Sequence, residues 1–152
     1  MDTDDLWVLV ANAGNAWLLR ADARHRRLEP IQGETHAAGR RKPGDLVSDR
    51  AGRSFDSSHG GARHAMEPDT DLKRAELHRF VLHLAHELDQ AALAGRYAGL
   101  VLVAEPRMLG ELRSTLPKHV AERVTMEIHK DLAGLDLAQL AERLEPELWA
   151  GA

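Results

Sequence analysis

Residues 99–106, with the sequence GLVLVAEP, decide the fold class. The run is apolar over the length of one strand, from Leu100 to Ala104, and its first carboxylate is Glu105. A strand that is apolar on both faces is typical of a parallel arrangement with helices on both sides of the sheet. This stretch therefore predicts an α/β protein, with helices expected before and after it along the chain.

A long amphipathic helix precedes this strand. Its apolar stripe recurs at helical spacing and consists of Leu77, Phe80, Val81, Leu84, Ala85 and Leu88. Asp69 or Thr70 is expected to cap its N-terminus, because either side chain can accept a hydrogen bond from a free backbone N–H, and Gly95 is expected to end it. After the strand, proline in the first turn predicts helices over 106–116 and 117–124.

Four further strands are predicted. Strands over 6–10 and 16–22 flank the turn-forming sequence ANAGN and predict a β-hairpin. A weaker third strand is expected around Leu28 to Gln32, where Pro30 indicates an edge position. Residues 124–128 alternate as a half-buried strand. One face of that strand is predicted to carry Val124, Met126 and Ile128.

The order of these elements predicts the architecture. Asp136 is expected to cap a last helix over 137–148. An antiparallel start followed by βαβ units predicts a mixed sheet of about five strands with flanking helices. Ribonuclease-H-like folds have this layout, although element order alone does not separate them from other three-layer α/β folds.

Composition excludes several classes of protein. The 152 residues are expected to form one domain, 1–152, with a hydrophobic core. With no cysteine, the chain has no disulfide, no thiolate nucleophile and no Cys-ligated metal. The N-terminus MDTDDLWVLV is unlike a secretory signal, and no apolar run approaches the roughly 20 residues of a membrane span. We therefore expect a soluble cytoplasmic protein without a membrane partner.

A long irregular segment, about 33–68, separates the third strand from the first helix. Residues 36–66 contain six basic and three acidic residues, a net charge of +3, whereas the rest of the chain has 14 basic and 21 acidic residues, a net charge of −7. Long segments without regular structure are uncommon in compact domains. We call residues 36–66 the basic segment. The charge contrast indicates a polyanionic partner at this segment, and a solvated loop is the alternative interpretation.

We recognise no catalytic, metal or cofactor motif in the sequence. The histidines of the long helix, His78, His83 and His86, lack the spacing of a zinc motif, so we interpret them as a solvated face. Glu105 has no partner carboxylate for two-metal nuclease chemistry, and no phosphate-binding glycine loop follows a strand. The serines and histidines of the basic segment lack a G-x-S-x-G elbow. We therefore predict no catalytic residue, no metal and no cofactor.

The basic segment is the candidate binding site. We predict an RNA- or partner-binding surface made of Arg50, Arg53, Ser54, Phe55, Gly60, Gly61, Arg63 and His64. Its arginines can make bidentate contacts to phosphate, and its paired glycines allow a close backbone approach. Phe55 either stacks on an RNA base or packs against the body and pins the segment. No DNA partner is expected.

Four stretches of the chain resemble the bacterial host-attachment protein family: WVLVANAGNAWLLRAD, DRAGRSFDSSHGGARHAMEPDTDLKRAE, LVLVAEPRMLGELR and EIHKDLAGLDLAQLAERL. The resemblance spans nearly the whole chain, and its most distinctive parts are the basic segment and Lys130–Asp131–Leu132. That family is in turn similar to the middle domain of archaeal and eukaryotic class 1 translation release factors. The resemblance implies a ribonuclease-H-like fold and an action on or around ribosomes.

The release factors carry a Gly-Gly-Gln loop into the peptidyl-transferase centre, where the glutamine positions the hydrolytic water. By this resemblance Gly60 and Gly61 match the paired glycines, whereas Ala62 stands at the position of the glutamine. The resemblance therefore implies binding to RNA or the ribosome rather than hydrolysis. A protein-interaction module used in host association and a hydrolase of peptidyl or aminoacyl esters are the alternatives.

Overall fold

The computed structural model describes residues 5–35 and 66–149, with side chains over 5–31 and 71–149. Its strands are β1 (Leu6–Ala11), β2 (Asn15–Asp22), β3 (Arg27–Thr35), β4 (Gly99–Val103) and β5 (Val124–Ile128). Its helices are α5 (Met66–Leu93), α6 (Pro106–Thr115), α7 (Lys118–Ala121) and α8 (Leu137–Leu148). The predicted binding surface, from Arg50 to His64, lies outside the described residues.

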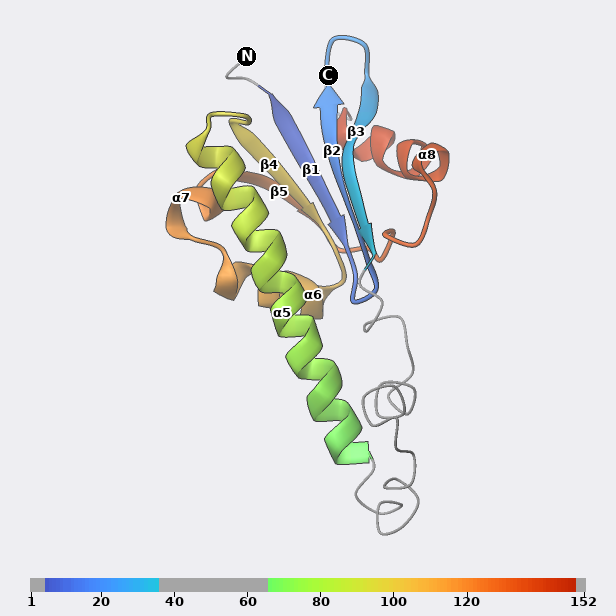
Figure 1. Cartoon of the computed structure of the whole chain (residues 1–152). Coiled ribbons are helices and arrows are strands. Elements are labelled where there is room, and N and C mark those ends of the chain that lie inside the picture. Colours follow the sequence, from blue (N-terminus) through green and yellow to red (C-terminus); the bar gives the residue numbers. More distant parts are fainter. Residues whose placement is uncertain (1–4, 36–65, 150–152) are drawn as a thin grey trace.

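The strands of the described chain form one mixed sheet in the order β3-β2-β1-β4-β5 (Figure 1). β1, β2 and β3 are joined by antiparallel pairing, whereas β1, β4 and β5 run parallel. Parallel neighbours need crossover connections, and the helices α5, α6 and α7 lie within those connections. The predicted fold class, an α/β mixed sheet of five strands with an antiparallel start, βαβ units and flanking helices, is confirmed.

Helices cover both faces of this sheet. Alternation along β1 and β4 places Leu9 and Leu102 in a core with α5, α6 and α7, and places Val8 and Val101 in a second core with α8. Each of these four side chains is at most 2% exposed. Burial on both faces explains why β4 is a continuous apolar run in the sequence.

The third strand is longer than the sequence predicted. β3 continues to Thr35, beyond the predicted end at Gln32, because its antiparallel pairing with β2 extends as far as the Asn15–Thr35 pair. The edge position that Pro30 indicated is confirmed, since β3 is the outermost strand on its side of the sheet. The irregular segment is shortened accordingly at its N-terminal end.

The first helix also begins earlier than predicted. α5 starts at Met66, so Asp69 and Thr70 lie inside the helix and are not its N-cap. Pro68 is compatible with this earlier start, because the backbone N–H groups of the first helical turn have no partner within the helix. The short helix predicted over 117–124 is confined to α7, because Val124 already belongs to β5.

The strand β5 does not alternate as predicted. Val124 pairs with Leu100 but Met126 pairs with Val101, so two residues of β5 span a single step of β4. This bulge reverses the faces of the strand. Val124 packs against the core under α6 and α7, Ile128 belongs to the core under α8, and Met126 is 37% exposed. The prediction that these three side chains share one face is therefore wrong.

Two helix termini follow the predicted signals. Gly95 has a φ of +71°, and just beyond it the N–H of Arg96 donates to the carbonyl of Ala91 at 2.9 Å, which ends α5. At the start of α8, Asp136 accepts the N–H of Gln139 at 2.8 Å, while the Gln139 side chain accepts the N–H of Asp136 at 3.0 Å. This reciprocal pair is a capping box.

Two glycine substitutions test these assignments. Gly95→Ala is expected to lower the free energy of unfolding by about 1 kcal/mol, because an L side chain is strained at this positive φ. Gly110 lies within α6 with open space around an added Cβ, so Gly110→Ala should raise the free energy of unfolding by about 0.5–1 kcal/mol. Urea denaturation measures both, and destabilisation of equal size in the two variants would contradict the account.

Candidate functional site

The carboxyl ends of four strands meet at one edge of the sheet, which we call the carboxyl edge. β1, β4 and β5 are parallel, and β3 runs in the same direction as β1 because both are antiparallel to β2. The chain leaves β3 at Thr35 and enters α5 at Met66. The basic segment is therefore attached at the edge where open α/β sheets usually bind their ligands.

α5 extends far beyond this edge of the sheet (Figure 1). Phe80 is buried, whereas no side chain from Asp71 to Arg79 is. At 1.5 Å per residue, the stretch from Met66 to Phe80 is about 21 Å long. The second attachment point of the basic segment consequently lies outside the packed body of the domain.

A hydrogen bond between two turns holds the carboxyl edge together. Asn12 follows β1, and its Oδ1 accepts the N–H groups of Gly14 at 2.8 Å and Asn15 at 2.7 Å, which shapes the β1–β2 turn. Its Nδ2 donates to Oδ1 of Asp131 at 2.9 Å. Asp131 follows β5, so this bond joins residues 119 positions apart in the sequence. The two turns are thereby fixed relative to each other.

The neighbours of Asp131 also have structural contacts. Lys130 Nζ lies 3.2 Å from Oε2 of Glu147 on α8, and Leu132 is 5% exposed within the core under that helix. The Lys130–Asp131–Leu132 segment, distinctive in the sequence, thus links the end of β5 to the β1–β2 turn and to α8. We interpret it as a structural link at the carboxyl edge.

The titratable side chains singled out in the sequence are dispersed. Glu105 occupies the N-cap position of α6, but its exposed side chain makes no capping hydrogen bond. The helix histidines His78, His83 and His86 are all exposed, with Nε2 of His83 at 3.7 Å from Oε1 of Glu87, and the predicted solvated face is confirmed. Over residues 5–31 and 71–149, no three His, Asp or Glu side chains are grouped so that they could hold a metal ion.

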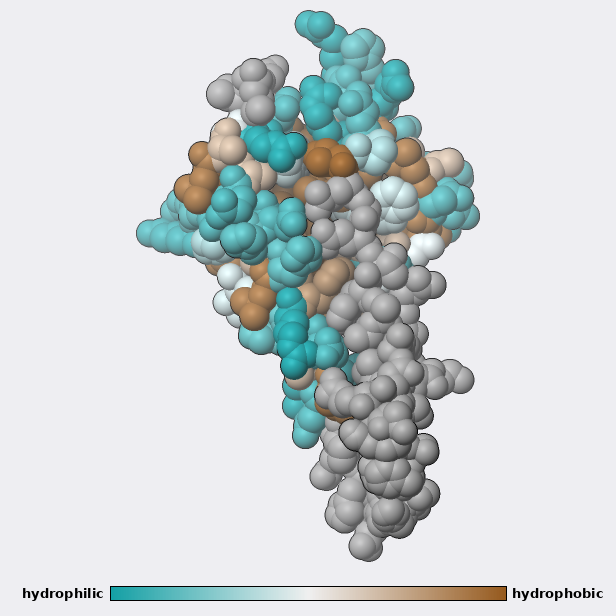
Figure 2. Space-filling view, in the orientation of Figure 1, coloured by the Kyte–Doolittle hydropathy of each residue, from teal (hydrophilic) through white to brown (hydrophobic). Residues whose placement is uncertain are grey.

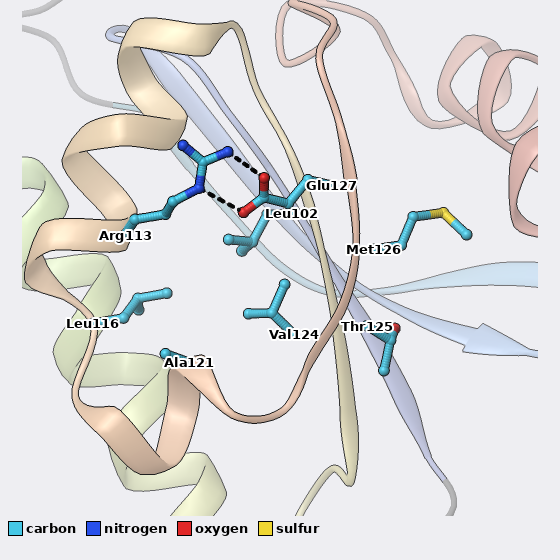
Figure 3. Close-up of a pocket in the computed structure, with 8 residues that line it drawn as sticks. All are labelled: Leu102, Arg113, Leu116, Ala121, Val124, Thr125, Met126 and Glu127. Carbon is cyan, nitrogen blue, oxygen red and sulfur yellow. Dashed lines mark hydrogen bonds and ion pairs between the residues drawn. The ribbon is translucent and has the colours of Figure 1, made fainter.

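An open hollow of about 540 Å³ lies between α6, α7 and β5 (Figure 3). Its apolar walls include Leu102, Leu116, Ala121 and Val124. At one end, Nε of Arg113 donates to Oε2 of Glu127 at 2.9 Å, and a second guanidinium nitrogen bonds the other carboxylate oxygen. The hollow therefore presents apolar walls and an ion pair whose charges neutralise each other.

Because of the Arg113–Glu127 ion pair, we expect the stability of the fold to fall at acidic pH. Hydrogen bonding from Arg113 holds the pKa of Glu127 below its ordinary value of 4.5. A carboxyl group with a lowered folded-state pKa stabilises the fold above its unfolded pKa, and that stability is lost as pH falls through the folded pKa. Glu127→Gln should flatten the fall in melting temperature between about pH 6 and pH 3. The exposed Glu142→Gln is the control, and an unchanged pH profile in Glu127→Gln would contradict the prediction.

The opposite, amino edge of the sheet carries a cluster that the sequence did not indicate. Trp7 and Tyr97 stack with ring centroids 4.9 Å apart, and the guanidinium groups of Arg96 and Arg123 lie over these rings at 5.1 and 5.6 Å. The Tyr97 hydroxyl donates to the carbonyl of Leu88 at 2.7 Å, and burial raises the pKa of Tyr97 to about 12. These contacts fasten the end of α5 to the sheet.

The geometry defines a class of protein: a mixed α/β sheet in which a basic segment is attached between an edge strand and a long helix. The structure is similar to the crystal structure of an archaeal translation termination factor, with a TM-score of 0.53 and 12% sequence identity over 98% of this chain and 38% of that chain. At this identity the likeness concerns the fold, and the predicted release-factor-like fold is confirmed.

The chain belongs to the family described as protein required for attachment to host cells, whose model matches residues 7–144. This confirms the family predicted from the sequence. An uncharacterized protein of Rickettsia prowazekii (strain Madrid E) is 37% identical over 68 residues, a match that covers 43% of this chain and 45% of that protein. The similarity thus spans less than half the length of that relative and of the termination factor. No helix in the described part of the chain is long and apolar enough to cross a bilayer.

Proposed function

We propose that this chain is a non-catalytic, release-factor-like module that binds structured RNA, ribosomal RNA foremost, through its basic segment. One observation carries the proposal: a segment of net charge +3 is attached at the carboxyl edge of a body of net charge −7. The body repels a nucleic acid whereas the segment attracts it, so the charge contrast orients the encounter. The fold shared with a translation termination factor supports the ribosome as the setting, and hence a cytoplasmic location.

Both attachment points of the segment belong to regular structure. β3 is paired with β2 as far as Thr35, and α5 is a continuous helix of 28 residues. The Asn12–Asp131 hydrogen bond fixes the neighbouring turns of the same edge. A rigid support lowers the entropy cost of holding a few side chains against a ligand.

The residues proposed to bind RNA are those of the predicted surface. Arg50, Arg53 and Arg63 contact phosphate oxygens through paired N–H donors, and Phe55 stacks on a base or packs against the body. Gly60–Gly61 allow the RNA backbone to approach closely. Ser54 and His64 supply neighbouring hydrogen-bonding groups.

The proposed module binds without hydrolysing an ester. Ala62 follows the paired glycines and has no polar side-chain atom that could position a water molecule. At the carboxyl edge, both polar side-chain atoms of Asn12 are already engaged in hydrogen bonds, with Gly14, Asn15 and Asp131. We therefore assign neither Ala62 nor Asn12 a catalytic role.

Limited trypsin digestion with and without ribosomes tests this proposal. Trypsin cleaves after lysine and arginine unless proline follows, and residues 36–66 offer five such positions, because Lys42 precedes Pro43. Saturating ribosomes are expected to slow cleavage within this segment several-fold, because bound RNA covers the arginines. Protection that survives nuclease treatment of the partner would favour the protein-interaction alternative. Cleavage rates unaffected by ribosomes would show that the basic segment does not bind them.

A further inference from the structure

The turn that joins β2 to β3 projects from the amino edge of the sheet, opposite the carboxyl edge (Figure 1). Three residues of this turn and the first residue of β3 form a run of basic, exposed side chains: Arg24, His25, Arg26 and Arg27. We call them the basic tip. Figure 2 shows hydrophilic residues over this projecting end of the molecule. The tip belongs to the acidic body, so it is distinct from the basic segment.

Asp22, the acidic residue beside the basic tip, fixes the conformation of the turn through hydrogen bonds. Oδ1 of Asp22 accepts the N–H groups of Arg24 at 3.0 Å and His25 at 3.3 Å, and its Oδ2 lies 2.8 Å from Nδ1 of His25. These bonds, the His25 side chain first among them, lower the pKa of Asp22. Within the described chain, no carboxylate forms an ion pair with Arg24, Arg26 or Arg27.

The backbone of the tip is strained at one arginine. Arg26 has a φ of 50°, and it is the sole non-glycine residue with a positive φ in the described part of the chain. Glycine would adopt this conformation with less strain. An arginine at a strained position suggests that its side chain has a function that glycine could not supply.

We propose that the basic tip is a second RNA-binding site, which contacts the phosphate backbone. Three guanidinium groups within four residues match the phosphate groups of a nucleic acid, each of which can accept two parallel N–H bonds. β3 runs from Arg27 at the tip to Thr35 at the carboxyl edge, a distance of about 26 Å along an extended strand. The tip therefore lies at the opposite end of β3 from Thr35, after which the basic segment begins. The inference rests on the tip alone and does not require the function proposed for the basic segment.

The surroundings of the tip favour RNA over a lipid surface or an acidic protein. The large hydrophobic side chains exposed in the described chain are Leu82, Leu93 and Met126, and none of them lies on the β2–β3 hairpin. Basic charge attracts anionic lipids, but stable membrane binding usually adds an apolar side chain that inserts into the bilayer, and the centre of a protein interface usually has an aromatic or apolar anchor. A tip that carries charge without such an anchor fits a phosphate backbone.

Fluorescence anisotropy with a labelled RNA stem-loop tests the inference. A variant with Arg24→Ala, Arg26→Gly and Arg27→Ala is expected to bind about tenfold more weakly at about 0.1 M salt, and its plot of log affinity against log salt should be shallower by about 2. The matched control removes three exposed positive charges from other elements, through alanine substitutions at Arg107, Lys118 and Arg143. The control should retain the wild-type affinity within about twofold.

The single variant Arg26→Gly separates binding from folding. Because it relieves the strained φ, its melting temperature should equal or exceed that of the wild type by up to about 2 °C. Its affinity for the stem-loop should nevertheless fall about two- to threefold, because one guanidinium group is lost. Wild-type affinity in Arg26→Gly, together with a wild-type salt slope in the triple variant, would overturn the inference.

Two further arms identify the ligand and the site. Polyglutamate and vesicles of phosphatidylcholine with phosphatidylserine replace the RNA, and an equal loss of binding to either of them in the tip variant would overturn the assignment to RNA. The alanine variant of Arg50, Arg53 and Arg63 is measured in parallel. If that variant alone loses RNA binding, the inference about the tip fails and the proposed function stands. If the tip variant alone loses it, the inference stands and the proposed function fails.

Discussion

Simultaneous substitution of Arg50, Arg53 and Arg63 by alanine is expected to weaken binding to a structured RNA roughly 10- to 100-fold at about 0.1 M salt. Each arginine that contacts a phosphate releases a condensed counterion when it binds. Loss of three such contacts should therefore make the plot of log affinity against log salt shallower by about 2 to 3. Fluorescence anisotropy over a salt series measures both quantities.

The control for this variant keeps the same loss of charge but moves it elsewhere. Alanine at Arg107, Lys118 and Arg143 removes three positive charges from exposed positions on α6, α7 and α8. The control and the basic-segment variant lose the same net charge, but only the control keeps the basic segment intact. The control should therefore bind RNA nearly as the wild type does. Similar losses in the two variants would mean that net charge, and not the basic segment, determines binding.

Leu140→Ala is expected to lower the free energy of unfolding by about 3 kcal/mol, within the range usual for a buried leucine. Leu140 is 0% exposed, and with Leu144 it forms the buried face of α8. In the described chain α8 is the helix that packs over Val8 and Val101, so a cavity at Leu140 weakens the second core directly. The expected loss is a large fraction of the roughly 5–15 kcal/mol that stabilises a typical domain.

The half-buried Leu137, on the same helix, is the control for this substitution. Leu137→Ala should cost less than about 1.5 kcal/mol, because less apolar surface is removed from the core. Urea denaturation of both variants gives the two free energies. A loss below about 1 kcal/mol in Leu140→Ala would contradict the assignment of α8 as the cover of that face.

Much of the fold is predictable because burial on two faces leaves a direct signature in sequence. The apolar run from Leu100 to Ala104 predicted a parallel strand buried on both faces, and Pro30 predicted an edge strand. The failure at β5 has a local cause. A bulge inserts one residue, so the apparent alternation of Val124 and Ile128 does not correspond to one face, and no residue type marks the bulge in advance.

The surroundings of the candidate site were less predictable. The Asn12–Asp131 hydrogen bond joins two turns that are distant in sequence, and only the strand order brings them to the same edge. The basic run from Arg24 to Arg27 is visible in the sequence, but its charge disappears when it is summed with the acidic residues of the body. A charge count over each turn, instead of over the whole body, would have identified it.

Co-sedimentation with ribosomes tests the central claim most directly. The wild-type chain is expected to pellet with ribosomes at moderate salt and to be released at high salt, because phosphate contacts weaken as salt rises. The alanine variant of Arg50, Arg53 and Arg63 should remain largely in the supernatant at the same moderate salt, while the control altered at Arg107, Lys118 and Arg143 should pellet as the wild type does. Equal sedimentation of the wild type and the basic-segment variant would contradict the claim that this segment binds ribosomal RNA.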